Sequence, residues 1–245
     1  MLSVGVMEKP SLRVSDDPGR RSINEFVRRA SALAPAGGRV LDAGAGECIY
    51  RPLFEGRRYV STDRGVGDAG WDYAALDALA DLERSPFREG IFDLVLCTET
   101  LEHVARPGRV LVELCRVLRP GGTLALSVPF LHPVHQAPHD FYRYTPFGLR
   151  HLLAEAGFDR VEVSASGGYF TYLRDQLSDF GAHLPLGVSL RPGSWLSWPL
   201  RLLARVAAAE LRFLVGFLRR LDDPHSRPLQ YFVIARRPDA IIPHS

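Results

Sequence analysis

Residues 39–46 read Arg-Val-Leu-Asp-Ala-Gly-Ala-Gly, an apolar run that ends in two closely spaced glycines. The apolar part predicts a buried strand. Gly44 and Gly46 predict a tight turn after it, because glycine tolerates sharp bends and has no Cβ to keep a ligand from the main chain. Asp63 ends a second apolar run, 17 residues after Gly46. Its carboxylate suits a ribose, since it can accept hydrogen bonds from both hydroxyl groups.

Two kinds of nucleotide site fit this pattern: a dinucleotide site, and an adenosyl site without a pyrophosphate. A dinucleotide fingerprint needs a third small residue at position 49, where the first helix packs closely on the strand under the pyrophosphate. This chain has Ile49 there. The sequence therefore favours an adenosyl site over nicotinamide and flavin dinucleotides.

Three further motifs follow in a fixed order. Phe92–Leu96 is another apolar run, Glu99–Val104 follows it, and Leu118–Gly122 (Leu-Arg-Pro-Gly-Gly) is a turn. With the glycines, this ordered set resembles the class I S-adenosylmethionine-dependent methyltransferases, in particular bacterial type 11-like members, over residues 39–165. In that family the motifs are the fourth strand, the segment after it and the turn before the fifth strand. Many members carry a further glycine where this chain has Cys48, which is small enough to fit the same turn.

The chain alternates strand and helix patterns, which predicts an α/β fold with a doubly wound parallel sheet. We expect strands at 39–42, 58–62, 91–96, 123–128, 160–164 and 230–235, and helices at 49–55, 107–118 and 146–156. The resemblance implies a mostly parallel seven-stranded sheet whose last two strands form a hairpin. Because roughly 65 residues separate Ser164 from Gln230, we expect a helical insertion before the last strand, at about 170–228. Residues 1–19 contain several helix breakers and are expected to form a mobile arm before a single methyltransferase-like domain at 20–245.

The composition argues against several classes of protein. A net charge of +2 is too small to indicate a nucleic-acid partner by itself. The three cysteines, Cys48, Cys97 and Cys115, are odd in number, which argues against a disulfide framework and for a reducing compartment. The start of the chain lacks a signal-peptide pattern, and no apolar run reaches the roughly 18 residues of a spanning helix. We therefore expect a cytoplasmic protein with one large domain.

The resemblance implies that the cofactor is S-adenosylmethionine, held at the ends of the first two strands. Asp63 would bind the ribose. Gly44 and Gly46 would let the methionine part lie on the backbone, with Asp42 near its ammonium group. Asp42 also fits a plainer role as a turn cap.

Two further pairs of residues belong to the implied cofactor site. Asp77 and Ala78 resemble the acid-plus-small pair that contacts adenine in the family, although Asp77 also fits a solvated helix start. Cys97 and Thr98, at the end of the fourth strand, would lie beneath the cofactor.

The acceptor side needs a group that removes a proton. A sulfonium already activates its methyl group, so the protein mainly aligns the acceptor and takes its proton. His135 and His139 are the preferred bases, with His103 behind them, because histidine titrates near neutral pH. The plainer interpretation of His103 is that it packs against a helix start and orients the loop.

Residues 130–144 bring three His, one Asp, one Arg and two Tyr into one loop after the fifth strand. We expect an active-site loop in which Tyr142, Arg143 and Tyr144 frame the acceptor. The alternative is a folded loop whose polar side chains satisfy its own backbone. The histidine spacing matches no closed structural zinc pattern, so no metal is expected. Residues 140–145 also resemble one bacterial branch of the family, often linked to cell-surface glycan or secondary-metabolite pathways.

Residues 195–221 predict an amphipathic helix. At 100° per residue, Arg201, Arg205, Arg212 and Arg219 fall within about 40° of one another, and most of the remainder is apolar. Such a helix fits a membrane interface, which would place the protein at the inner membrane surface. The interpretation that we favour is that the apolar face covers the domain itself or a second subunit of a homodimer, with the Arg heads in water.

The sequence therefore predicts transfer of a methyl group to an oxygen or nitrogen of a small molecule, such as a sugar or a lipid-linked metabolite. Nucleic-acid acceptors rank lower, because no basic groove with interleaved aromatic residues is evident. The alternative is a non-catalytic relative that keeps the fold as a binding or scaffold module. The intact glycines and Asp63 favour the enzyme.

Overall fold

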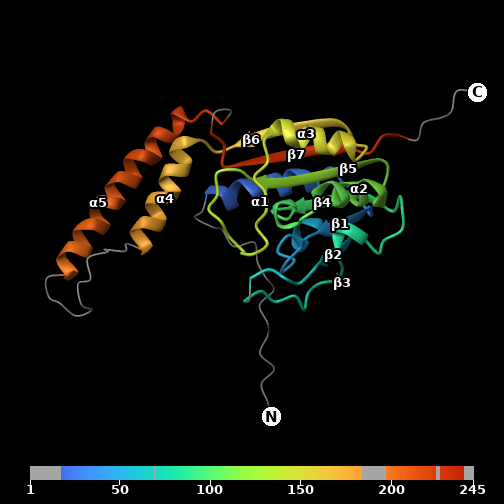
Figure 1. The fold of residues 1–245 in the computed structure, drawn as a ribbon, viewed down its shortest axis with the longest axis horizontal. Helices are drawn as coiled ribbons and strands as arrows, with labels where there is room; N and C mark the ends of the chain where they lie inside the picture. The colour runs from blue at the N-terminus through green and yellow to red at the C-terminus, as the bar shows by residue number, and fades with distance from the viewer. Residues whose placement is uncertain (1–17, 69, 184–196, 225–226, 240–245) are drawn as a thin grey trace, which may run out of the picture.

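The computed structural model describes residues 18–68, 70–183, 197–224 and 227–239 (Figure 1). Of the arm expected at 1–19, only Pro18 and Gly19 fall within these ranges, and they begin the first helix, α1 (Pro18–Ser31). The rest of that prediction lies outside the described residues.

Seven strands form one sheet in the order β3-β2-β1-β4-β5-β7-β6. Their bounds are β1 Arg39–Ala43, β2 Arg58–Asp63, β3 Ala78–Leu79, β4 Phe92–Thr98, β5 Leu118–Pro129, β6 Asp159–Ser166 and β7 Gln230–Arg236. The pairs among β1 to β5 are parallel, whereas β7 runs antiparallel to both β5 and β6. The sheet confirms the predicted α/β fold, with a mostly parallel, doubly wound sheet that ends in antiparallel strands. The two-residue β3 was not expected.

The helices connect these strands. Beside α1 they are α2 Pro107–Val117, α3 Pro146–Glu155, α4 Tyr169–His183 and α5 Ser197–Leu218, with short 3-10 helices η1 Arg51–Phe54, η2 Leu82–Arg84, η3 Leu101–His103 and η4 Arg219–Leu221. The prediction of a helix at 49–55 was wrong, because only the single turn η1 forms there. The element ends at Glu55, whose φ of −54° and ψ of 139° are not helical, and Cys48 and Gly56 on either side of the segment have left-handed φ angles of 58° and 77°.

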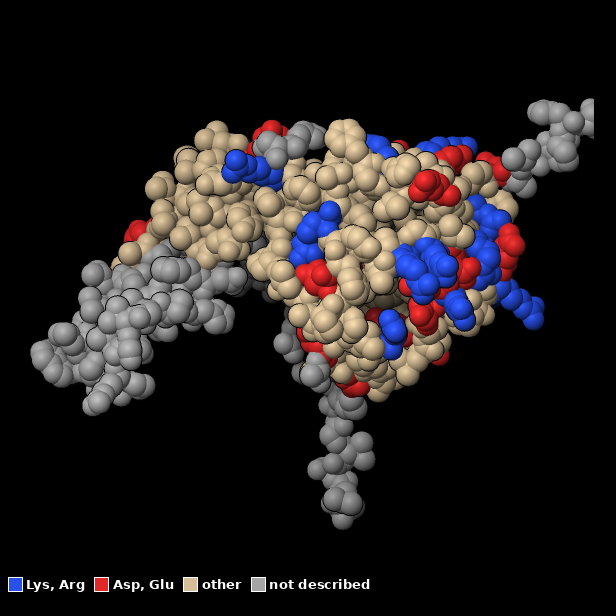
Figure 2. Space-filling view, viewed as in Figure 1, with Lys and Arg blue, Asp and Glu red and all other residues tan. Residues whose placement is uncertain are grey.

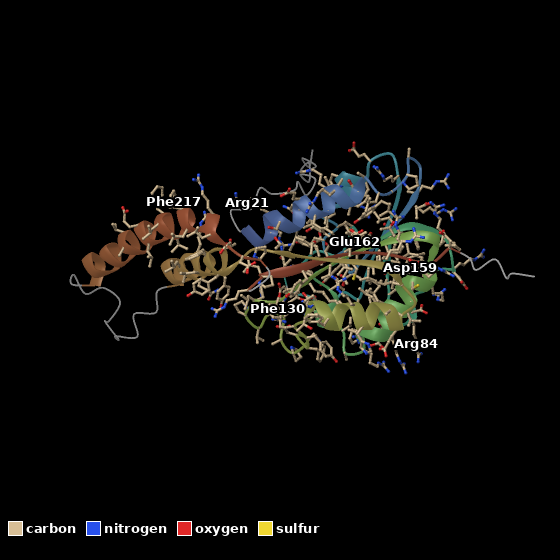
Figure 3. All side chains as sticks on the ribbon, turned by 90° about the horizontal axis from the view of Figure 1, so that it is seen from above. Arg21, Arg84, Phe130, Asp159, Glu162 and Phe217 are labelled. Atoms are coloured by element: carbon tan, nitrogen blue, oxygen red, sulfur yellow. The ribbon has the colours of Figure 1, made fainter. Side chains whose placement is uncertain are left out.

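The helices cover both faces of the sheet: α1 lies on one face, and α2 and α3 lie on the other (Figure 3). Successive residues of a strand point to opposite faces. Leu94 and Leu96 of β4 therefore pack with α1, whereas Val95 and Cys97 pack with α2 and α3. This burial on two sides explains why β4 is a continuous apolar run rather than an alternating one.

Helices α4 and α5 occupy the chain between β6 and β7, and they pack side by side beyond one end of the sheet (Figure 1). We call this pair the helical hairpin. Val215 of α5 is buried, whereas the neighbouring Phe213 is 82% exposed, so only one side of α5 is covered. The side chains of the four predicted arginines, Arg201, Arg205, Arg212 and Arg219, lie outside the described part. Among the described residues, no helix combines the length and the apolar character that crossing a membrane requires.

Candidate active site

A cavity of about 950 Å³ opens at the carboxyl ends of the parallel strands. Its walls come from the glycine turn after β1, the segments after β2, β3 and β4, the loop after β5, and the sides of α1 and α4. The strand order reverses between β1 and β4, and open α/β sheets bind ligands at such a switch point. The cavity is therefore the candidate active site.

The glycine turn forms a cradle that only glycine permits. Gly44 and Gly46 adopt φ angles of +82° and +50°. A Cβ at Gly44 would overlap the side chain of Thr100, with only 2.7 Å to Thr100 Cβ. The Asp63 carboxylate accepts hydrogen bonds from the main-chain N–H groups of Gly46 at 3.0 Å and Gly65 at 2.8 Å, which ties the turn to the end of β2. Gly44, Gly46 and Asp63 all line the cavity, where the sequence predicts them.

Asp42 does not line the cavity with them. It is fully buried on the α1 face of the sheet, where Tyr59 donates a hydrogen bond to Oδ2. Burial raises the pKa of Asp42 to about 7, although the hydrogen bond from Tyr59 opposes the shift. Asp42 was expected near the ammonium group of the cofactor. In the structure it lies instead behind the glycine turn, away from the cavity.

Asp77 and Ala78 also lie outside the cavity lining. Asp77 precedes β3, and its Oδ2 accepts hydrogen bonds from Arg51 at 3.0 Å and from the Ser61 hydroxyl at 2.8 Å. The acid that lines the cavity is Asp81, which follows β3 at its carboxyl end. The sequence did not single out Asp81, because the short β3 between Asp77 and Asp81 was not recognised.

The end of β4 contributes Thr98, as predicted, but not Cys97, which is buried in the core away from the cavity. The sequence did not single out Glu99, which also lines the cavity and accepts a hydrogen bond from Ser127 Oγ at 2.8 Å. Burial raises the pKa of Glu99. Its position directly after the fourth strand was the signal that could have identified it.

All three predicted base candidates, His103, His135 and His139, line the cavity. His103 and His135 come from different loops, and their ring centroids lie 4.7 Å apart. The main-chain oxygen of His139 lies 3.0 Å from His103 Nδ1, so the loop after β5 packs directly on the segment after β4.

Tyr142, Arg143 and Tyr144 do not line the cavity, so they do not frame an acceptor there. The guanidinium of Arg143 forms a two-pronged ion pair with Asp140, at 2.6 and 2.8 Å, which holds the pKa of that carboxyl well below its usual range. Tyr142 and Tyr144 donate hydrogen bonds to main-chain carbonyl groups at 3.0 and 2.9 Å. These residues match the alternative interpretation, in which polar side chains of the loop hold its own fold.

One part of the cavity wall was not predicted from the sequence. It is formed by residues of α1, of the turn before η1, of α4 and of the start of β7: Arg20, Tyr50, Tyr172, Arg174, Gln176 and Gln230. Gln230 Nε2 donates to the main-chain oxygen of Gly19 at 3.2 Å, which joins β7 to α1 at this wall. No local motif marks these residues, because they are distant in sequence and meet only in the fold.

Comparison with known proteins identifies the class. The model of a methyltransferase-domain family matches residues 41–126. The chain is 32% identical to a demethylmenaquinone methyltransferase from Parafrankia sp. over 71% of this chain and 76% of that protein. It is also 27% identical to a phosphatidylethanolamine N-methyltransferase from Cereibacter sphaeroides, over 67% of this chain and 89% of that protein. An S-adenosylmethionine-dependent methyltransferase structure from Archaeoglobus fulgidus superposes with a TM-score of 0.55 and 14% identity, covering 88% of this chain and 93% of that one, and supports the fold.

The chain belongs to the class I S-adenosylmethionine-dependent methyltransferase family. It is an enzyme of that class, and its cofactor is S-adenosylmethionine. The scaffold alternative is thereby set aside.

Proposed function

We propose that the enzyme transfers a methyl group to an oxygen or nitrogen of a lipid-linked small molecule. The observation that carries this proposal is the position of the helical hairpin. Tyr172 and Arg174 of α4 line the cavity, while α5 packs on α4 and leaves an apolar surface exposed. The cavity wall and the apolar surface thus belong to one structural unit. Such a unit suits an acceptor with a polar reactive end and an apolar tail.

The cofactor would occupy the side of the cavity formed by the glycine cradle. Asp63 would accept from the ribose hydroxyls, because each oxygen of an ionised carboxylate can accept more than one hydrogen bond. Asp81 would accept from the adenine amino group, and Gly44 and Gly46 would bring the main chain against the methionine part. Thr98 also lines the cavity. When bound, the cofactor supplies a methyl group on a positively charged sulfur.

The acceptor would occupy the side near the three histidines. His139 is our preferred base, because the residue lines the cavity and its ring lies beside Phe141, with 6.3 Å between the ring centroids. The rings of His103 and His135 are instead directed at Glu102. A neutral histidine that faces an acceptor hydroxyl or amine can take its proton.

The apolar surface of α5 lies outside the layers of the sheet domain. The large exposed apolar residues of α5 and η4 are Val206, Leu211, Phe213, Leu214, Phe217 and Leu221. Figure 3 labels Phe217 on α5, and Figure 2 shows few charged side chains on the described part of the hairpin. At 100° per residue most of these side chains fall on one side of the helix, with the exposed Glu210 among them. A largely apolar exposed face of this kind marks an interaction surface, and we propose that it contacts a membrane interface.

The names of two relatives agree with this proposal. Demethylmenaquinone and phosphatidylethanolamine, for which those proteins are named, both carry long apolar chains. A lipid-linked acceptor would bring its tail to the hairpin and its polar end to the cavity.

The proposal can be tested with a labelled methyl group. The enzyme is incubated with S-adenosylmethionine carrying a labelled methyl group and with either a lipid extract or an aqueous extract of its host cells. We expect label in the lipid fraction. Label confined to water-soluble products would contradict the lipid-linked acceptor and favour a sugar or another soluble metabolite.

Replacement of Asp81 with Asn should weaken binding of S-adenosylhomocysteine by about tenfold to a hundredfold, because a hydrogen bond to a charged group contributes roughly 1.5–3 kcal/mol. The matched control is Asp77→Asn, which removes an acid at the other end of β3 that does not line the cavity. Calorimetric titration measures both. A larger loss for Asp77→Asn than for Asp81→Asn would restore the assignment made from the sequence.

If α5 contacts membranes, the Phe213→Ser/Phe217→Ser double variant should bind vesicles at least tenfold more weakly than the wild type in a sedimentation assay. The reason is that burying one Phe side chain contributes about 1.5–3 kcal/mol. The vesicles contain phosphatidylcholine with or without phosphatidylglycerol. Phe147→Ser is the matched control, because Phe147 on α3 is 80% exposed and lies outside the hairpin. If wild type does not pellet but forms a dimer that the double variant disrupts, α5 is a subunit interface instead.

A further inference from the structure

Glu102 is a fully buried carboxylate in η3, next in sequence to His103, which lines the cavity. Both of its carboxylate oxygens lack a hydrogen-bond partner among the residues that the structure describes. Burial raises the pKa of Glu102 well above its ordinary value, and the charge of Glu99 adds to the shift. A buried carboxylate without donors is costly as an anion unless a cation compensates it.

Two histidines converge on this carboxylate. His103 Nε2 lies 3.6 Å from Glu102 Oε1, and His135 Nε2 lies 4.0 Å from the same oxygen. One ligand atom from each of the three residues fits within 4.8 Å of the others. Neighbouring ligands in a tetrahedral shell with bonds of ~2.1 Å lie ~3.4 Å apart, so these atoms would have to approach one another by up to about 1.4 Å to bind one ion.

The other ring nitrogen of each histidine faces an oxygen. His103 Nδ1 lies 3.0 Å from the main-chain oxygen of His139. His135 Nδ1 lies 3.2 Å from the main-chain oxygen of Pro133 and 3.3 Å from Asp140 Oδ2. These acceptors favour the ring proton on Nδ1 and turn the Nε2 lone pairs toward the carboxylate. Histidine ligands in metal sites are oriented in the same way by a carboxylate or a carbonyl behind them.

We propose that Glu102, His103 and His135 form a binding site for one divalent first-row transition-metal ion. Two imidazoles and one carboxylate are a donor set that suits Zn²⁺ and Fe²⁺ and that leaves at least one coordination position for another ligand. His103 and His135 line the cavity, so this position faces the side assigned to the acceptor.

The role of the ion rests on the proposed function. An acceptor oxygen that binds at the open position would be held beside the cofactor side of the cavity, and the pKa of its hydroxyl would fall. Metal binding itself does not depend on which acceptor is used. Failure of the lipid-extract experiment would therefore leave this site untouched.

The test measures metal binding to full-length protein from which any affinity tag has been removed. We expect one Zn²⁺ per chain by calorimetric titration and by metal analysis after dialysis. Co²⁺ should give visible absorption bands of an N/O site. Glu102→Gln and His135→Ala should each weaken Zn²⁺ binding at least a hundredfold.

His151→Ala is the matched control. His151 Nε2 also lies near a carboxylate, 3.5 Å from Glu155 Oε1, but this pair is exposed on α3. Its replacement should leave the stoichiometry and affinity unchanged. His135 is only half-buried, so His135→Ala remains informative if Glu102→Gln fails to fold. The absence of Zn²⁺ binding by the wild type, or equal binding by His135→Ala, overturns the proposal and leaves Glu102 as a protonated buried acid.

Discussion

Gly44→Ala is expected to lower the free energy of unfolding by more than about 3 kcal/mol and to abolish cofactor binding. Two costs combine at this position. An L-residue at a φ angle of +82° is strained, by about 1–2 kcal/mol. The new Cβ would also overlap the Thr100 side chain and lie 2.7 Å from Thr100 Cβ. Rotation of the Thr100 side chain cannot relieve this clash, because Cβ is fixed to the main chain.

Urea denaturation and calorimetric titration with S-adenosylhomocysteine measure the two effects. Gly56→Ala separates the costs, because Gly56 has a φ angle of +77° but no atom of the described residues lies within 4 Å of the place that a Cβ would take. That control should lose only about 1–2 kcal/mol and should keep its cofactor affinity. Equal losses in the two variants would show that the contact with Thr100 does not restrict the turn.

The parts of the fold that the sequence predicts well are those whose signal is local. The strand and turn at 39–46 carry their own apolar run and glycines, and β4 is marked as a strand buried on both faces. Prediction fails where an element is too short to carry a pattern. The two residues of β3 have no periodicity, so neither the strand nor the cavity-lining acid after it, Asp81, was identified from the sequence.

The candidate site was harder to predict than the fold, because its residues meet only through tertiary packing. His135 stands 32 residues after His103, and no spacing rule connects them. In the loop after β5 the sequence shows which residue types are present but not which way they face. Arg143 turns to Asp140, whereas His139 faces the cavity.

For Asp42, the sequence motif identified the residue but not the direction of its side chain. The motif marks an acid at the end of β1, but the direction of its side chain follows from strand alternation. Asp42 is two residues after Val40, which packs on the α1 face, so both side chains point to that face. The carboxylate therefore lies behind the turn, where Tyr59 donates a hydrogen bond to it.

The contribution of Asp42 to the stability of the protein is expected to fall as the pH rises from about 4 to about 7. Its pKa is about 7 in the folded protein, as a result of burial, and about 3.9 in an unfolded chain. Between these values the unfolded chain has released the proton and the folded protein still holds it. The unfolded state is then favoured by about 1.4 kcal/mol for each pH unit, and the whole effect approaches ~4 kcal/mol.

Asp42→Asn isolates this contribution, since an amide keeps the shape of the side chain and does not titrate. Urea denaturation of wild type and variant at several pH values gives two stability profiles, and their difference removes the contribution of every other group. We expect the variant to gain stability relative to wild type as the pH rises through this window, and the difference to become constant above the folded pKa. Parallel profiles would show that Asp42 titrates at its ordinary pKa, so that burial beside Tyr59 is not the dominant influence on its charge.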